Sequence, residues 1–387
     1  MRAGLSRLAA IQLAVSAIVL GCIGLAQAQT PKGSLEADYL APLRAASCLK
    51  GVAPEKPAAI DLAAKPVPLQ AMNAKRKVIG ELAFVGGFHL TSSDKRFGGL
   101  SGIDVLEDGN LLAVSDDGKF VWIDLGEDGV TPKAARIAAM RDAAGEVMGS
   151  KAGRDAEGLA YADGLALVSY EGDHRVLAFD LAACGAAARG APVMFGAFGG
   201  GLQAAFDRAG LKVGGNSGAE ALAVSPDWFL FTGLESQAGG ASPLSARAIE
   251  AGPEFDLSIG KGMPPVVGMD IVTDGDKVRV FSLHRATNAM ASNVISIVET
   301  VFTREFDQSN LPAHRISEIA GRRHDRFREA SSRVLAQMNL FVTIDNYEGI
   351  AARELPDGRV RLYVIADDNF SAKQRTLLMI YDVAKRS

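Results

Sequence analysis

Short apolar runs, separated by turns and acidic residues, recur along most of the chain. The clearest unit spans residues 346–383 and contains, in order, Glu348-Gly349, Pro356-Asp357-Gly358, an apolar run over 360–366, Asp367-Asp368-Asn369 and a second apolar run over 377–381. Apolar runs of this length around a Pro-Asp-Gly turn are typical of a β-hairpin. The unit therefore predicts a strand, a hairpin turn, a strand, a polar loop and a third strand.

Four earlier stretches repeat this unit in weaker form. Each has a small or acidic step before a strand, then a turn and a second strand; the stretches begin at Gly99, Asp155, Asn216 and Gly268. The acids keep a similar separation, since Glu157 precedes Glu171 by 14 residues and Glu220 precedes Glu235 by 15. Self-similar units of this size, each built from short strands, predict the blades of a β-propeller.

The fold class expected from these repeats is an all-β, six-bladed β-propeller. Five units are visible, and a sixth is expected within 301–340 or shared between the chain ends. In 311–338, the spacing of the apolar residues predicts a strand followed by a short helix inserted before the last blade; these residues are Ile316, Ile319, Phe327, Val334 and Leu335. A strand within 77–90 is expected to close the ring against the last blade.

The N-terminal region predicts export. Residues 1–28 contain two Arg, an apolar run over 8–20 and the small-x-small site Ala26-Gln27-Ala28, which together are typical of a secretory signal peptide. Lipoprotein processing at Cys22 is the alternative. Residues 29–76 predict a strap with a short helix over 35–49, and 77–387 predict the propeller. The expected location is periplasmic or secreted, without a stable membrane span after cleavage.

Charge and cysteine content narrow the function classes. The chain has 41 Lys and Arg against 45 Asp and Glu, and removing the two signal-peptide Arg leaves a net charge of −6. A mildly acidic protein without a basic, aromatic patch is not expected to bind nucleic acid. In an oxidising compartment, Cys48 and Cys184 either form a disulfide or remain two thiols.

The repeated acids are the candidate metal ligands. Equivalent positions on the innermost strands of a propeller face one central tunnel, so Glu157, Glu220 and Glu348 are expected to share a ring. Glu171, Glu235, Asp116 and Asp367 are expected to form a second ring. Converging carboxylates repel one another unless a cation neutralises them, and an all-oxygen donor set favours calcium. Alternatively, these carboxylates bind backbone amides and hold the blades together.

Basic residues beside the acids indicate an anionic small-molecule substrate. The candidates for stabilising a phosphate or carboxylate group are Arg154, Arg285 and Arg375, with Glu348 as the acidic partner in catalysis. For each Arg, a salt bridge to a neighbouring Asp is the alternative. Serine catalysis is poorly supported, because no G-x-S-x-G step is present.

Several segments together resemble one known family. GLSGI at 99–103, DAEGLAY at 155–161, NSGAEALAV at 216–224, and NYEGIA with DDNFSAKQRTLL at 346–378 are similar to the phytase-like propellers described as "esterase-like activity of phytase". The resemblance implies a secreted or periplasmic propeller that hydrolyses phosphoesters or esters with calcium. The chain departs from the family pattern at Ala221, in place of Gly, and at Ser282-Leu283-His284-Arg285, which lacks a carboxylate.

Three functions follow as hypotheses. The first is a metal-dependent phosphoester or ester hydrolase. The second is a non-catalytic binding propeller of the cell envelope. The third is a lactonase-type propeller enzyme with one central metal.

Overall fold

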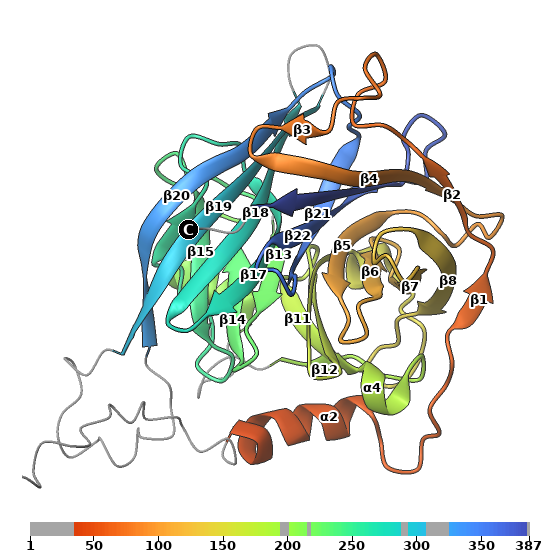
Figure 1. The fold of residues 1–387 in the computed structure, drawn as a ribbon. Coiled ribbons are helices and arrows are strands. Elements are labelled where there is room, and N and C mark those ends of the chain that lie inside the picture. Colours follow the sequence, from red (N-terminus) through yellow and green to blue (C-terminus); the bar gives the residue numbers. More distant parts are fainter. Residues whose placement is uncertain (1–34, 194–200, 215–217, 288–292, 307–324, 385–387) are drawn as a thin grey trace, which may run out of the picture.

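Five antiparallel β-sheets are arranged around a central axis in a computed structural model of the protein (Figure 1). The structure describes residues 35–193, 201–214, 218–287, 293–306 and 325–384. The fold is therefore a β-propeller with five blades, and the expectation of a sixth blade was wrong. The expected signal peptide, residues 1–28, lies outside the described residues.

Each blade has four main strands, ordered from the axis outward. The innermost strands are β5 (Leu100–Val105), β9 (Ala156–Ala162), β13 (Ala221–Val224), β17 (Val266–Asp274) and β21 (Asn346–Glu354). The second strands are β6 (Leu111–Ser115), β10 (Leu165–Tyr170), β14 (Phe229–Gly233), β18 (Lys277–Thr287) and β22 (Val360–Asp367). The third strands are β7 (Lys119–Leu125), β11 (Arg175–Asp180), β15 (Ser242–Ala248), β19 (Asn293–Phe306) and β23 (Leu377–Val383). The fourth strands are β8 (Pro132–Ala139), β12 (Ala191–Pro192), β16 (Leu257–Ile259), β20 (Asp325–Met338) and β4 (Leu82–Thr91).

The two ends of the chain form the fifth blade together. β4 pairs antiparallel with β23, from Leu82 opposite Val383 to Leu377 opposite His89. This pairing confirms the expected closure of the ring by a strand near residues 77–90. β2 (Ala63–Pro66) and β3 (Val78–Ile79) pair with β4, and β1 (Ala58–Ile60) adds a fifth strand to the first blade. The strap thus covers two strand edges that would otherwise be open to pairing with other chains.

The residues assigned to a sixth blade and a helix belong to the fourth blade. Phe327, Val334 and Leu335 lie in β20, a strand of 14 residues that pairs along its length with β19. Two β-bulges in this pairing shift the two-residue alternation of buried side chains. Phe327 lies seven and eight positions before Val334 and Leu335, a separation that also fits two turns of a helix. Ile316 and Ile319 lie outside the described residues.

The N-terminal strap is attached by a disulfide. η1 (Glu36–Leu40) is a π-helical turn, and α2 (Ala41–Ser47) continues it, as the sequence predicted for this region. Cys48 then bonds to Cys184 at the end of α4 (Leu181–Cys184), with the Cα atoms 5.6 Å apart. The disulfide alternative is therefore confirmed, although α4 lies within the second blade, between β11 and β12.

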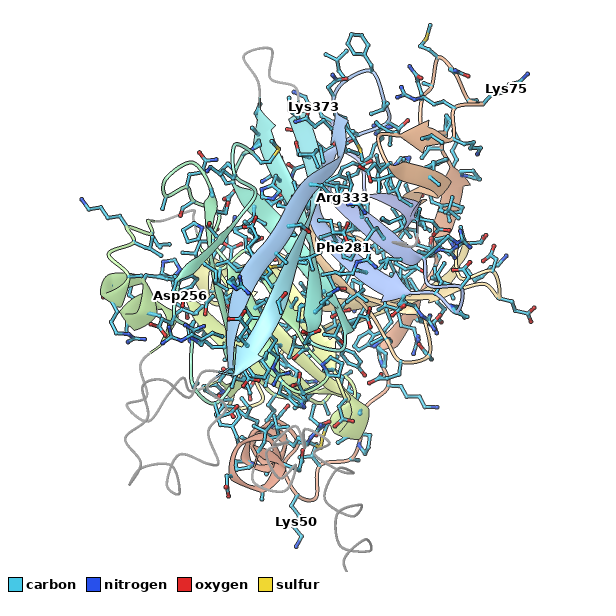
Figure 2. The ribbon with its side chains drawn as sticks, turned by 60° about the vertical axis from the view of Figure 1, so that its left-hand side comes forward. Lys50, Lys75, Asp256, Phe281, Arg333 and Lys373 are labelled. Carbon is cyan, nitrogen blue, oxygen red and sulfur yellow. A yellow bond between two sulfur atoms is a disulfide. The ribbon has the colours of Figure 1, made fainter. Side chains whose placement is uncertain are left out.

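The remaining helices are short and lie in loops. They are α3 (Lys151–Arg154) between the first two blades and α5 (Leu202–Arg208) between the second and third. In the described part of the chain, no helix has the length and apolar character needed to cross a membrane. Figure 2 shows Lys50, beside the disulfide, and Lys373, in the loop after β22, at opposite ends of the molecule.

Candidate functional site

Ten equivalent positions surround one mouth of the propeller axis. Five lie where the innermost strands begin and are occupied by Ser101, Glu157, Glu220, Val267 and Glu348. Five lie at or just after the ends of the second strands and are occupied by Asp116, Glu171, Glu235, Arg285 and Asp367. We call these the inner ring and the outer ring. Together they hold seven carboxylates and one guanidinium.

A local backbone feature turns the inner-ring residues toward the axis. The ladder between the first two strands is interrupted at Ser101, Val267 and Glu348, and it is also irregular around Glu157. A β-bulge of this kind reorients one side chain without ending the strand. The carboxylate–glycine steps predicted from the sequence are therefore bulges that present a side chain at the mouth.

Glycines after these bulges allow the innermost strands to lie close together. A Cβ atom at Gly102 would be 2.6 Å from the carbonyl oxygen of Glu157, and one at Gly158 would be 2.9 Å from that of Glu220. A Cβ at Gly349 would be 2.9 Å from the carbonyl oxygen of Ser101. Real Cβ atoms need more than 3.0 Å. The absence of a side chain thus sets the diameter of the ring.

The inner-ring acids are buried and repel one another. Burial, followed by the charge of Glu220, raises the pKa of Glu157 well above its usual range. Burial and the charge of Glu235 do the same to the pKa of Glu220. The Glu157 carboxylate has no hydrogen-bond partner among the residues that the structure describes. The alternative that each acid binds backbone amides is therefore not what the structure shows for Glu157.

The outer-ring acids have the same character. Burial raises the pKa of Glu171 to about 7, and Asp155 and Glu235 add to the rise. Burial raises the pKa of Asp116 to about 6, while burial and the charge of Glu348 raise that of Asp367 to about 8. These shifts mean that the ionised acids lack sufficient positive charge nearby.

Arg285 takes the outer-ring position of the fourth blade. Its Nη1 donates to Glu348 Oε1 at 2.7 Å and to Asn346 Oδ1, and its Nη2 is 3.7 Å from Glu235 Oε1. Asn346 Nδ2 also donates to Glu348 Oε1, at 2.8 Å. The residue that replaces a carboxylate in this blade is therefore an internal counter-ion. It is the counter-ion of Glu348 and lies near Glu235, whereas Glu157 and Glu171 of the second blade have no ion pair among the described residues.

A cation fits among the acids of the second and third blades. One carboxylate oxygen from each of Glu171, Glu220 and Glu235 lies within 4.8 Å of the other two. Oxygen donors at this spacing suit a hard cation such as calcium. The Glu157 carboxylate of the inner ring, which has no hydrogen-bond partner among the described residues, adds negative charge. Glu348 and Asp367, also predicted as ligands, lie at the mouth in the fifth blade. Glu348 is bound by Arg285, and Asp367 Oδ1 accepts a hydrogen bond from the Asn369 N–H at 2.7 Å.

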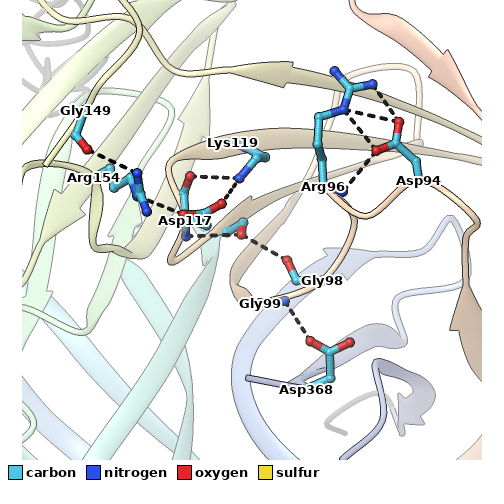
Figure 3. Close-up of polar contacts among 10 residues, drawn as sticks. Asp94, Arg96, Gly98, Gly99, Asp117, Lys119, Gly149, Arg154 and Asp368 are labelled. Carbon is cyan, nitrogen blue, oxygen red and sulfur yellow. Dashed lines mark hydrogen bonds and ion pairs between the residues drawn. The ribbon is translucent and has the colours of Figure 1, made fainter. Parts of the chain in front are cut away.

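Arg154 is the last residue of α3, Arg375 lies in the loop before β23, and both are at the edge of the mouth. Arg154 Nε is 2.8 Å from Asp117 Oδ1, and its Nη1 donates to the Gly149 carbonyl at 3.1 Å (Figure 3). Arg375 Nε donates to Asp345 Oδ2 at 3.0 Å. Both therefore have the Asp partner that was the alternative expected from the sequence, whereas Arg285 faces the rings.

One residue of the mouth was missed from the sequence, and another gains in importance. Asn346 holds both Arg285 and Glu348, and its position two residues before Glu348 was the available signal. Asp116, expected only as a member of the second ring, has its Oδ1 buried without a hydrogen-bond partner among the described residues.

A second acidic pair lies three residues further along the innermost strands. Asp104 Oδ2 accepts a hydrogen bond from the Tyr161 N–H at 2.6 Å, which links the first blade to the second. Asp270 Oδ2 accepts one from the Ala352 N–H at 2.6 Å, which links the fourth blade to the fifth. Burial raises the pKa of Asp270 to about 7, and burial and the charge of Asp270 raise that of Asp104.

These carboxylates predict a pH-dependent stability. The folded-state pKa of Asp270 is above its unfolded value, so Asp270 contributes stability at low pH that is lost as pH rises toward 7. The amide that Asp270→Asn introduces cannot titrate. We expect the unfolding free energy of Asp270→Asn, relative to wild type, to improve by about 2–3 kcal/mol between pH 5 and pH 8.

Urea unfolding of both proteins across this pH range, in chelator, measures that difference. If the amide NH₂ introduced by Asp270→Asn faces a backbone N–H, the variant loses a constant amount of unfolding free energy at every pH. Such a loss displaces the plot of unfolding free energy against pH but does not change its slope. Parallel curves for the two proteins would contradict the shifted pKa.

The chain matches one protein family in sequence and several solved structures in fold. The profile of the phytase-like family described as "Esterase-like activity of phytase" matches residues 95–370. No curated protein matches the sequence significantly. The solved structures that match include the PQQ-bound aldose sugar dehydrogenase of Streptomyces coelicolor, at 12% identity and a TM-score of 0.41, covering 84% of this chain and 99% of that one. The glutaminyl cyclase of Myxococcus xanthus matches at 11% identity and a TM-score of 0.34, covering 86% and 100%.

Proposed function

Because this chain belongs to the phytase-like family described as "Esterase-like activity of phytase", we propose that it is a calcium-dependent hydrolase of phosphate monoesters outside the cytoplasm. The observation that carries the proposal is the asymmetry of the mouth. Glu171, Glu220 and Glu235 converge at the second and third blades, and Arg285 stands at the fourth, where it is bound to Glu348 and lies 3.7 Å from Glu235. A cation beside a fixed guanidinium is an arrangement that binds and polarises a phosphoryl group.

The acids of the second and third blades are the proposed cation ligands. Glu171, Glu220 and Glu235 supply converging oxygens, and the adjacent Glu157 carboxylate supplies further negative charge. Bound there, calcium would act as a Lewis acid toward the phosphoryl oxygen and lower the pKa of a bound water. The carboxylates would bind the calcium ion, and the calcium ion would attract the phosphate. An acidic protein could therefore bind an anionic substrate.

Arg285 is the proposed anion-binding residue. Its contacts with Glu348 and Asn346 fix the guanidinium through Nη1, while Nη2 is 3.7 Å from Glu235 and so retains donors for a phosphate oxygen. Glu348 orients Arg285 and neutralises only part of its positive charge. Arg154 and Arg375 remain candidates at the edge, where each would first have to leave its Asp partner.

Turnover of p-nitrophenyl phosphate and phytate tests this function. Chelator is expected to abolish hydrolysis and added calcium to restore it. Glu348→Gln is expected to lower kcat/KM roughly tenfold, because Arg285 loses its charged partner.

Activity that neither the chelator nor Glu348→Gln changes would overturn the metal mechanism. Calcium-dependent ligand binding without turnover would instead support a non-catalytic binding propeller. Hydrolysis of lactones but not of phosphates would support a lactonase-type enzyme.

A further inference from the structure

The loop after β22 holds an aromatic side chain in an unfavourable backbone conformation. Asn369 and Phe370 have φ angles of 48° and 47°. Asn tolerates this left-handed region, but a bulky residue such as Phe rarely adopts it. The conformation of Phe370 costs roughly 1–3 kcal/mol, which surrounding contacts must offset.

Two aspartates hold the loop in this conformation. Asp367 Oδ1 accepts from the Asn369 N–H at 2.7 Å, and Asp368 Oδ1 accepts from the Phe370 N–H at 3.0 Å. Asp368 Oδ1 also accepts from the Gly99 N–H at 2.9 Å, which ties the fifth blade to the first (Figure 3). Thr376 Oγ1 donates to the other oxygen of Asp368 at 2.9 Å. The backbone that carries Phe370 is therefore held in place before any ligand arrives.

The phenyl group of Phe370 lies next to Asp116, a member of the outer ring. A Cβ atom at Gly99 would be 2.5 Å from Phe370 Cε2 and would also overlap Asp116 Oδ1. The phenyl group of Phe370 and the carboxylate of Asp116 therefore both pack against Gly99. Gly99 has a φ of 63° and no side chain, which the close approach requires. Phe370 is nevertheless 47% exposed. Because the residue is about half exposed, burial of its side chain gives little reason to hold it in a strained loop.

Charges of both signs lie beside the Phe370 side chain, with Asp116 and Asp368 next to it and one lysine nearby. Lys119 Nζ lies 6.0 Å from the centre of the Phe370 ring and pairs with Asp117. Asp116 and Glu348 interact electrostatically, and Glu348 is bound to Arg285. Phe370 thus occupies the edge of the same mouth that holds the proposed anion-binding residue. An organic group attached to a phosphate at that mouth would meet the exposed face of the ring.

We propose that Phe370 is a specificity residue that packs against the leaving group of the substrate, and that the preferred substrates are phosphate monoesters of aryl alcohols. This inference rests on the proposed function for the anionic end of the ligand. Because its backbone is held in place, Phe370 loses little conformational freedom on binding. A stacked aromatic pair then favours an aryl over a methyl group by about fivefold to tenfold.

The test compares two non-hydrolysable ligands with the same charged group. Calorimetric titration of the calcium-loaded protein with phenylphosphonate and methylphosphonate gives the ratio of their dissociation constants. We expect wild type and Phe370→Tyr to prefer phenylphosphonate by about fivefold to tenfold. Phe370→Asn, which fits the backbone without a bulky side chain, is expected to bind both ligands equally and to unfold at the same temperature or higher.

A second exposed phenylalanine serves as the control. Phe341, in the loop between β20 and β21, is 69% exposed, and Phe341→Ala is expected to keep the preference for the phenyl ligand. Equal binding of both ligands by wild type, or a preference that survives in Phe370→Asn, would overturn the inference. A preference that depends on Phe370, in a protein without hydrolytic activity, would support the inference and overturn the proposed catalysis. Failure of both ligands to bind would overturn both.

Discussion

Replacement of Glu220 by Gln is expected to lower the calcium-dependent kcat/KM at least 100-fold. Glu220 is the most buried of the three converging acids and belongs to the inner ring, where its neighbours are Glu157, Glu171 and Glu235. Removal of its charge takes away a ligand that the other acids cannot replace without moving. Loss of a metal ligand has at least the effect of losing an outer-shell partner, which is 10–100-fold.

The same substitution is expected to have opposite effects on stability with and without calcium. At a calcium concentration of about 100 times the dissociation constant, binding should stabilise wild type by about 2.7 kcal/mol, and Glu220→Gln should lose this gain. Without calcium, the variant should be at least as stable as wild type, because one of several buried, mutually repelling carboxylates is gone.

Glu354→Gln is the matched control, since Glu354 is exposed at the far end of β21. Urea unfolding of the three proteins, each with calcium and with chelator, measures the effect. A variant that loses stability equally in both conditions would show that Glu220 has only a structural role.

A methyl group at Gly268 is expected to destabilise the propeller by about 3 kcal/mol. The added Cβ would overlap the carbonyl oxygen of Glu348, a backbone atom that cannot rotate away. The innermost strands of the fourth and fifth blades would have to separate, and Glu348 would move relative to Arg285. Gly268→Ala should therefore also weaken the binding of phosphate.

Thermal unfolding and phosphate titration measure these two effects. Gly149→Ala is the control, because no atom lies within 4 Å of a Cβ at Gly149 and its backbone is not in the left-handed region. The control should change the unfolding free energy by less than about 0.5 kcal/mol. A Gly268→Ala protein as stable as this control would contradict the close packing of the innermost strands.

The repeats carried most of the information about the fold. Equivalent carboxylates in successive units predicted that Glu157, Glu220 and Glu348 meet near one axis, because each innermost strand faces the same tunnel. The number of blades was wrong for a physical reason. In β20, the apolar residue Phe327 lies seven and eight positions before Val334 and Leu335, which imitates helical spacing. In addition, β19 and β20 are each 14 residues long, so one blade occupies the length expected for more.

The asymmetry of the site could not be read from the repeats. In the fourth unit, Val267 and Arg285 take the places that carry acids elsewhere, so the unit looked degenerate. Arg285 was a candidate from the sequence, but its pairing with Glu348, 63 residues away, required the fold. Phe370 was hidden similarly, since its proximity to Asp116 depends on ring closure between the first and last blades.

The central claim is that carboxylates from separate blades hold a cation at one mouth of the propeller. Calorimetric titration of the chelator-treated, full-length protein with calcium tests it most directly. The account predicts saturable binding of calcium that disappears in Glu220→Gln and persists in Glu354→Gln. Absence of calcium binding by wild type, or an unchanged isotherm in Glu220→Gln, would contradict it.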